Sequence, residues 1–126
     1  MREIKTEFAP LPAGHYAQAI EHQGLVYISG QLPVKPGVKD KVVGSIEEQT
    51  EQVLANLEAI LLAADSSKEQ VIKATVYISD IRLWDRVNKV YADFFEDHRP
   101  ARAIVPTREL HFGFQIEIEA IAFVKN

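Results

Sequence analysis

The last part of the chain places charged residues inside two strand-like runs, and this arrangement limits the possible folds more than any other feature. The runs are Ala101–Glu109 and Gln115–Val124, and a short connection containing a glycine joins them. This pattern predicts a β-hairpin. Arg102 begins the first run, and Glu117 and Glu119 lie in the second. Because successive side chains of a strand point to opposite faces, the two glutamates are expected on one face of a sheet.

The face that carries the glutamates becomes apolar further along, since Ile121 and Phe123 follow at the same spacing of two. A charged group beside apolar surface needs a partner or a function. For Arg102, the structural alternative is a salt bridge at the start of a strand. Glu117 and Glu119 are equivalent in this pattern, so one can serve a reaction and the other an ion pair, in either order.

Two amphipathic helices are predicted in the middle of the chain. The first begins at Ser45, because Ser45 and Glu48 form a capping-box pattern ahead of apolar residues at helical spacing. It should end near residues 65–67. The second helix is capped by Ser79 or Asp80.

The remaining strand-like runs complete the fold prediction. Tyr16–Glu21 and Leu25–Gly30 flank a tight turn, and Val71–Ile78 is rich in β-branched residues, as central strands are. The element order is therefore β-β-α-β-α-β-β. It predicts an α+β fold, in which a mixed sheet carries both helices on one face, within a single domain spanning residues 1–126.

Alternation also predicts which strand residues face the helices. In the last strand these are Ile116, Ile118, Ala120 and Ala122, and in the central strand they are Ile72, Ala74, Val76 and Ile78. The opposite face is mixed but too apolar to remain in water. Because an exposed patch of this kind marks an interface, we expect a homo-oligomer that covers its open sheet faces.

Composition excludes several classes of protein. The net charge is -4 and no basic block occurs, so the chain lacks the charge pattern of a nucleic-acid binder. The chain has no cysteine, which excludes disulfides and thiolate chemistry. No secretory or membrane-spanning segment is recognisable, so we expect a cytoplasmic protein without membrane contact. The four histidines show no metal-ligand spacing, and we expect no metal site.

Several segments, in order along nearly the whole chain, resemble the RidA (YjgF) family of reactive-intermediate deaminases. The segments are GHYAQA from Gly14, VYISGQ from Val26, QTEQVLANLEAILLA from Gln49, VIKATVYISD from Val71, VNKVY from Val87, RPAR from Arg99 and IEIEAIA from Ile116. The resemblance implies a chorismate-mutase-like α+β fold and a homotrimer with three clefts between neighbouring copies. It also implies hydrolysis of enamines and imines, such as 2-aminoacrylate and 2-iminopropionate, to 2-keto acids and ammonia without a cofactor.

The resemblance also assigns roles to individual residues. Arg102 matches the arginine that holds the substrate carboxylate, and an arginine suits this role because its planar fork pairs with a carboxylate through two hydrogen bonds. Glu117 matches the glutamate that positions the water, and a carboxylate is a suitable general base for that step. Tyr16 and Ser29 match residues that line the cleft.

Three places depart from the family pattern and bear on substrate choice. His15 and Ile104 stand where family members often have a proline and a cysteine, and His111 lies in a connection that differs from the usual turn. Ile104 and His111 are expected to border the substrate. An alternative function is a non-catalytic protein that binds a small carboxylate metabolite in the same cleft and regulates a partner.

Overall fold

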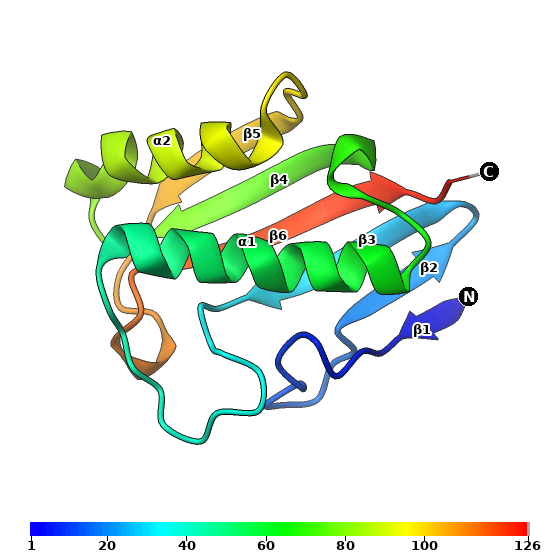
Figure 1. Cartoon of the computed structure of the whole chain (residues 1–126), viewed down its shortest axis with the longest axis horizontal. Coiled ribbons are helices and arrows are strands. Elements are labelled where there is room, and N and C mark those ends of the chain that lie inside the picture. The colour runs from blue at the N-terminus through cyan, green and yellow to red at the C-terminus, as the bar shows by residue number, and fades with distance from the viewer. Residues whose placement is uncertain (126) are drawn as a thin grey trace.

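The structure is a computed structural model that describes residues 1–125. It contains one six-stranded sheet in the order β1-β2-β3-β6-β4-β5, and both helices lie on the same face of this sheet (Figure 1). The strands are β1 (Arg2–Ile4), β2 (Ala19–His22), β3 (Leu25–Gln31), β4 (Val71–Ile78), β5 (Ala101–Pro106) and β6 (Ile116–Phe123). The helices are α1 (Ile46–Ala63) and α2 (Trp84–Phe95), and short 3₁₀ turns are η1 (Lys68–Gln70), η2 (Ile81–Leu83) and η3 (His111–Gly113). The predicted α+β architecture is confirmed.

The capping box predicted for α1 is present, whereas the cap predicted for α2 belongs to the 3₁₀ turn that precedes it. At α1, Ser45 Oγ accepts a hydrogen bond from the Glu48 backbone N–H at 3.1 Å, and the Glu48 side chain accepts one from the Ser45 backbone N–H at 3.0 Å. This reciprocal capping box satisfies two backbone donors that have no partner inside the helix. Asp80 caps η2, and η2 leads directly into α2. The helix α2 therefore begins at Trp84, four residues after Asp80.

The N-terminal strands differ from the prediction in their extent. β2 begins at Ala19 and not at Tyr16, and β1 is an additional strand that pairs antiparallel with β2. Residues 5–18 form irregular chain between them. The side-chain amide of Gln18 holds this chain in place, because it bonds the backbone N–H of Thr6 at 2.8 Å and the carbonyl of Pro10 at 2.9 Å.

The predicted hairpin between Ala101–Glu109 and Gln115–Val124 is wrong. β5 pairs in parallel with β4, whereas β6 pairs antiparallel with both β3 and β4, so β4 lies between β5 and β6. β5 ends at Pro106, and the chain then passes the end of β4, where Thr107 N–H donates to the Ile78 carbonyl and Ser79 N–H donates to the Gln115 carbonyl. A parallel neighbour needs a crossover connection, which here is α2. The two strand-like runs follow each other in the sequence but do not pair with each other in the sheet.

The alternation predicted for β6 is confirmed, since Ile116, Ile118, Ala120 and Ala122 are all buried. In β4 the prediction fails at one end, because Val71 is buried and Ile72 is exposed. A register irregularity lies between Val71 and Lys73. A bulge inserts one extra residue and exchanges the faces of the side chains before it.

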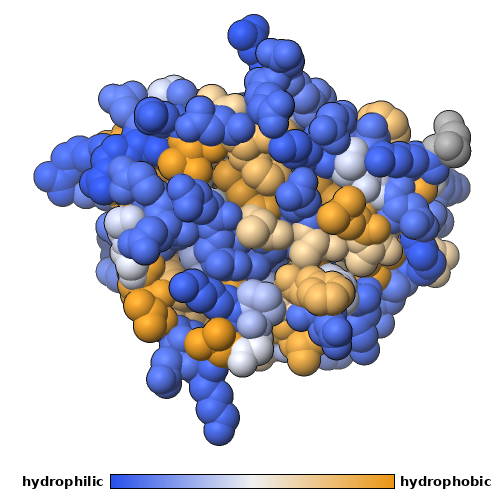
Figure 2. All heavy atoms as spheres, viewed as in Figure 1, coloured by the Kyte–Doolittle hydropathy of each residue, from blue (hydrophilic) through white to orange (hydrophobic). Residues whose placement is uncertain are grey.

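The two faces of the sheet differ in their cover. The side that bears the helices is mostly hydrophilic, with hydrophobic residues in separate patches (Figure 2). On the opposite face, Tyr27 and Phe123 are each 45% exposed and Val105 is 37% exposed. The apolar surface expected there is present. Within residues 1–125, no helix has the length and apolar character needed to cross a bilayer.

Candidate active site

The two glutamates of β6 project from the helix-free face, as predicted, but they have different partners. Glu117 pairs in register with Tyr77 of β4, and Glu119 pairs with Thr75. The Tyr77 hydroxyl donates a hydrogen bond to Glu119 Oε1 at 2.5 Å. The Glu117 carboxylate has no hydrogen bond to any group within residues 1–125. Glu119 is thus occupied by a structural contact, and Glu117 is available.

Gly30 of β3 provides the space for the Glu117 carboxylate. A Cβ atom at Gly30 would collide with Glu117 Oε2 and would lie 3.1 Å from its Cδ atom. The close approach requires the absence of a side chain and not a glycine-specific backbone angle, because Gly30 is not among the glycines with positive φ. The sequence contains no signal for this role, which arises only when β3 and β6 pair.

The surroundings of Glu117 favour its protonated form. Burial raises the pKa of the Glu117 carboxyl above its ordinary value, and the negative charge of Glu119 raises it further. The positive charge of His111 acts in the opposite direction. His111 lies in the exposed turn η3, close enough for its charge to act on Glu117, and its predicted contact with substrate stays a prediction.

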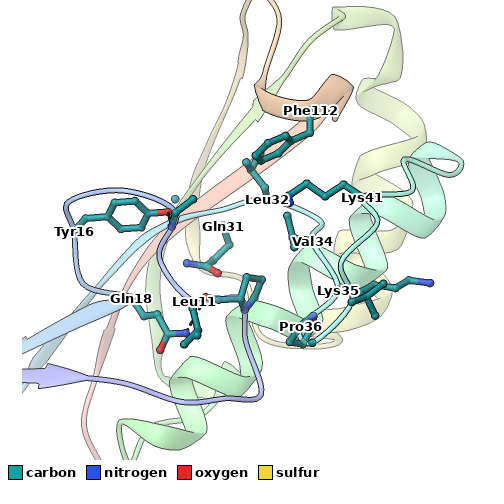
Figure 3. A pocket seen from close by; sticks show the side chains of 15 residues that line it. Leu11, Tyr16, Gln18, Gln31, Leu32, Val34, Lys35, Pro36, Lys41 and Phe112 are labelled. Atoms are coloured by element: carbon teal, nitrogen blue, oxygen red, sulfur yellow. Dashed lines mark hydrogen bonds between the residues drawn. The ribbon is translucent and has the colours of Figure 1, made fainter.

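A cavity of about 280 Å³ adjoins this region (Figure 3). Tyr16, Gly30 and Phe112 are among its lining residues, and Tyr16 and Phe112 approach it from different segments of the chain. Tyr16 is held by its hydroxyl, which accepts a hydrogen bond from the Ala13 backbone N–H at 3.2 Å. Ser29 supports the same loop, because its hydroxyl donates to the Ala17 carbonyl at 2.6 Å. Gly30 lines this cavity and adjoins Glu117, whose neighbour His111 precedes the lining residue Phe112. We call the group of Tyr16, Ser29, His111 and Glu117 the acidic half-site.

Arg102 lies elsewhere, on the edge strand β5. It pairs in register with Ala74, which is buried beneath the helices, so the Arg102 side chain projects toward α2. Arg102 Nη1 donates a hydrogen bond to Asn88 Oδ1 at 2.8 Å. The guanidinium carbon lies 4.8 Å from the centre of the Tyr91 ring and 5.5 Å from that of Trp84. These groups form what we call the basic half-site.

The Arg102 guanidinium is half-buried and has only neutral partners. No carboxylate of residues 1–125 lies within salt-bridge distance of it. Burial raises the pKa of the Tyr91 hydroxyl to about 12, with the Arg102 charge opposing, so this neighbour stays uncharged at neutral pH. Arg102 and Tyr91 border a cavity of about 480 Å³ between α2 and the start of β5. The salt bridge considered from the sequence is absent within the described chain.

Ile104 lies two residues beyond Arg102 and points to the same side of the sheet. It pairs in register with the buried Val76 and packs partly buried against the core. Ile104 therefore belongs to the basic half-site and not to the region around Glu117.

The structure does not bring Arg102 and Glu117 together within one chain. Their side chains project from opposite faces of the sheet, and β4 separates their strands. The half-sites must combine across two copies of the chain if they form one site. Sequence reasoning missed Gly30, Asn88 and Tyr91 as supports of the two key residues, because their contacts depend on strand order and helix packing.

Metal chemistry has no evident location in the described part of the chain. Residues 1–125 contain no group of three or more histidine, aspartate or glutamate side chains that could hold an ion.

Comparison with known proteins identifies the family of this chain. A family model described as "Endoribonuclease L-PSP" matches residues 6–124. The chain belongs to this family, also called the RidA (YjgF) family. A RutC family protein of Aquifex aeolicus is 42% identical over 97% of this chain and 98% of its own length. AldR of Lactococcus lactis, named as a proposed regulator, is 43% identical over the full length of both chains.

Solved structures of RidA-family proteins have the same fold. A proposed endoribonuclease of Thermotoga maritima gives a TM-score of 0.95 at 43% identity, covering 100% of this chain and 99% of that one. The Escherichia coli protein TdcF, solved with bound serine, gives a TM-score of 0.93 at 34% identity, covering 99% and 100%. RidA of an Antarctic Psychrobacter species also gives 0.93, at 35% identity over 98% and 100%.

The space provided by Gly30 can be tested in this RidA-family chain by a Gly30→Ala substitution. The new methyl group should displace the carboxyl end of Glu117, and the Glu117 carboxyl ¹³C resonance should shift. The free energy of unfolding should change by less than about 1 kcal/mol, because alanine reduces the entropy of the unfolded chain. Gly14→Ala, whose added Cβ meets only Tyr16 at an ordinary 3.4 Å, is the control and should leave that resonance in place. An unmoved Glu117 resonance in Gly30→Ala would contradict the contact.

The raised pKa of Glu117 predicts a pH-dependent effect of Glu117→Gln on stability. The folded chain binds the Glu117 proton more tightly than the unfolded chain, so ionisation of Glu117 costs stability as pH rises above the ordinary glutamate pKa of 4.5. Urea unfolding should show equal stability of the two proteins at low pH and a more stable glutamine variant at neutral pH. A wild-type protein that is the more stable at neutral pH would show that Glu117 is stabilised in its charged form.

Proposed function

We propose that this protein hydrolyses small 2-imino acids, and the enamines that tautomerise to them, to 2-keto acids and ammonia. The observation that carries this proposal is the half-buried Arg102 guanidinium, which has neutral partners only. A cation in such a place favours an anionic ligand, because its own surroundings leave its charge uncompensated. Membership of the RidA family supports the same interpretation.

In the proposed reaction, Arg102 binds the carboxylate of the substrate. Asn88 uses one of the N–H groups of the guanidinium, and the others remain for a paired contact with two carboxylate oxygens. The faces of Tyr91 and Trp84 limit the positions that the guanidinium can adopt. The substrate is thereby fixed at one end, and its imine carbon is presented to the rest of the site.

Glu117 acts as the general base. Its carboxylate accepts a proton from a water molecule as the water oxygen bonds to C2 of the imine, and the carboxyl then gives this proton to the imine nitrogen. Glu117 next takes the hydroxyl proton of the resulting carbinolamine and delivers it to the amino nitrogen, so that the C2–N bond breaks, ammonia leaves and the C2 carbonyl forms. The net reaction converts imine and water to keto acid and ammonia. A raised pKa of Glu117 suits this role, because a base is most effective when its pKa approaches the working pH.

We further propose that the site forms between copies of the chain in a homotrimer. Cyclic trimers use contacts in which one surface of a copy meets a different surface of the next. Such a contact can join the basic half-site of one copy to the acidic half-site of its neighbour. The partly exposed apolar residues of the helix-free face, including Tyr27, Val105 and Phe123, are suited to burial in this assembly.

One solved relative supports the ligand class. TdcF was solved with bound serine, a small amino acid that carries a carboxylate. A site that recognises small carboxylates therefore fits the family.

The expected cytoplasmic location stays a prediction.

A second function fits the same cleft. The chain could bind a small carboxylate metabolite without converting it and regulate a partner, and the name of AldR points in this direction. Ribonuclease activity, named in the family description, has less support here because the net charge is -4 and RNA-binding surfaces are usually basic. Measurement of turnover separates the enzyme from the regulator.

The activity can be tested with a pyridoxal-phosphate-dependent dehydratase that releases the imine from serine or threonine. Purified protein should accelerate formation of the keto acid. Arg102→Ala should lower kcat/KM about a hundredfold, because removing one partner of a desolvated charge pair costs several kcal/mol. Arg102→Lys should retain part of the activity, since it keeps the charge but not the fork.

Arg86→Ala is the matched control. Arg86 pairs with Glu47 on the surface at 2.7 Å, and exposed pairs of this kind contribute little. Its activity should equal that of the wild type. No acceleration by the wild-type protein would overturn the enzyme proposal, whereas equal acceleration by Arg102→Ala would overturn the assignment of Arg102.

A further inference from the structure

The orientation of the Arg102 guanidinium depends on three neutral groups of α2. Asn88 accepts a hydrogen bond from Nη1 at 2.8 Å, and the rings of Trp84 and Tyr91 lie near the guanidinium carbon. These residues occupy positions i, i+4 and i+7 of one helix, which places them on one face of it. A flexible arginine side chain is thus held at its charged end and not only along its stem.

We propose that Asn88 is a positioning residue that fixes the plane of the Arg102 guanidinium for carboxylate binding. The aromatic contacts restrict where the guanidinium lies, but a ring face does not select one rotation of the group. The hydrogen bond to Nη1 does select one, because it is directional. With that N–H engaged, the remaining N–H groups keep a constant direction toward the ligand.

The chemistry of an asparagine side chain explains why it suits this role. Its amide oxygen accepts a hydrogen bond but carries no net charge, so it orients the guanidinium without neutralising it. An aspartate at position 88 would orient Arg102 equally well but would compete with the substrate for its charge. In the sheet Arg102 lies opposite Ala74, whose side chain is too small to reach the guanidinium, so Ala74 does not replace Asn88 as its partner.

The inference rests on the proposed function for its purpose, since the oriented guanidinium is expected to bind the carboxylate of the substrate. Its physical content can be measured without any turnover. Restricted rotation of the Arg102 guanidinium about its Nε–Cζ bond is visible by NMR as separate ¹⁵Nη resonances. Binding of pyruvate, a 2-keto acid of the product class, can be followed by calorimetry.

Three variants test the proposal. Asn88→Ala should merge the Arg102 Nη resonances and weaken pyruvate binding about tenfold, as expected for loss of a hydrogen bond to a charged group. Its KM in the dehydratase assay should rise by a similar factor, with kcat changed less than about twofold. Asn88→Asp should keep the resonances separate but weaken pyruvate binding about a hundredfold, because the new carboxylate occupies the guanidinium. Lys89→Ala, an exposed neighbour on α2, should match the wild type in each measurement.

The outcomes distinguish this proposal from the proposed function. Separate Nη resonances and unchanged pyruvate affinity in Asn88→Ala would overturn the role of Asn88. A wild-type protein that neither binds pyruvate nor hydrolyses imines would overturn the proposed function, and the Nη resonances would still decide whether Asn88 holds Arg102. If Asn88→Ala does not fold, Asn88→Asp decides the matter, because it should keep the Arg102 Nη resonances separate while weakening pyruvate binding. Equal pyruvate affinity in Asn88→Asp and wild type would contradict the proposal.

Discussion

The positive charge of Arg102, half-buried among neutral groups, is the interaction on which the proposed chemistry depends. An asparagine and two aromatic rings stabilise the guanidinium, and none of them cancels its charge. Placing a cation in such surroundings costs free energy that a carboxylate ligand can offset. The fold holds this group at the edge of the sheet, on β5, where a ligand or a second copy of the chain can approach it.

Strand order determines how the rest of the site is arranged. Because β4 lies between β5 and β6, the arginine and the glutamates occupy different strands and different faces. Glu117 and Glu119 share one face, but the Tyr77 hydroxyl bonds Glu119 and leaves Glu117 without a protein partner in residues 1–125. The distinction between two carboxylates that look equivalent in the sequence thus comes from one cross-strand contact. Assembly of copies then becomes a requirement of the proposed site itself.

The features that depend on local patterns could be predicted from the sequence. The capping box at Ser45, the helical stripes and the alternation along β6 each arise from neighbours in the chain, and all are confirmed. The sequence prediction failed where partners are distant. The hairpin of β5 and β6 is wrong because two successive strand signals do not state which strand lies between them, and the bulge in β4 exchanges Val71 and Ile72.

The candidate site shows the same division. Arg102 and Glu117 were singled out as charges within strand-like runs, the resemblance to the RidA family assigned their roles, and that family is confirmed. Their roles stay predictions. Their supports were not found, because Gly30 meets Glu117 and Asn88 meets Arg102 only after distant segments pack together.

The central claim is that Arg102 of one copy and Glu117 of another form each active site. It is tested most directly by unfolding Arg102→Ala and Glu117→Gln together, refolding the mixture and measuring imine hydrolysis. Each variant alone should be nearly inactive, whereas random mixed trimers should regain about a quarter of the wild-type activity, because a site can combine the two intact residues from different copies. A mixture no more active than the separate variants would contradict a site shared between copies.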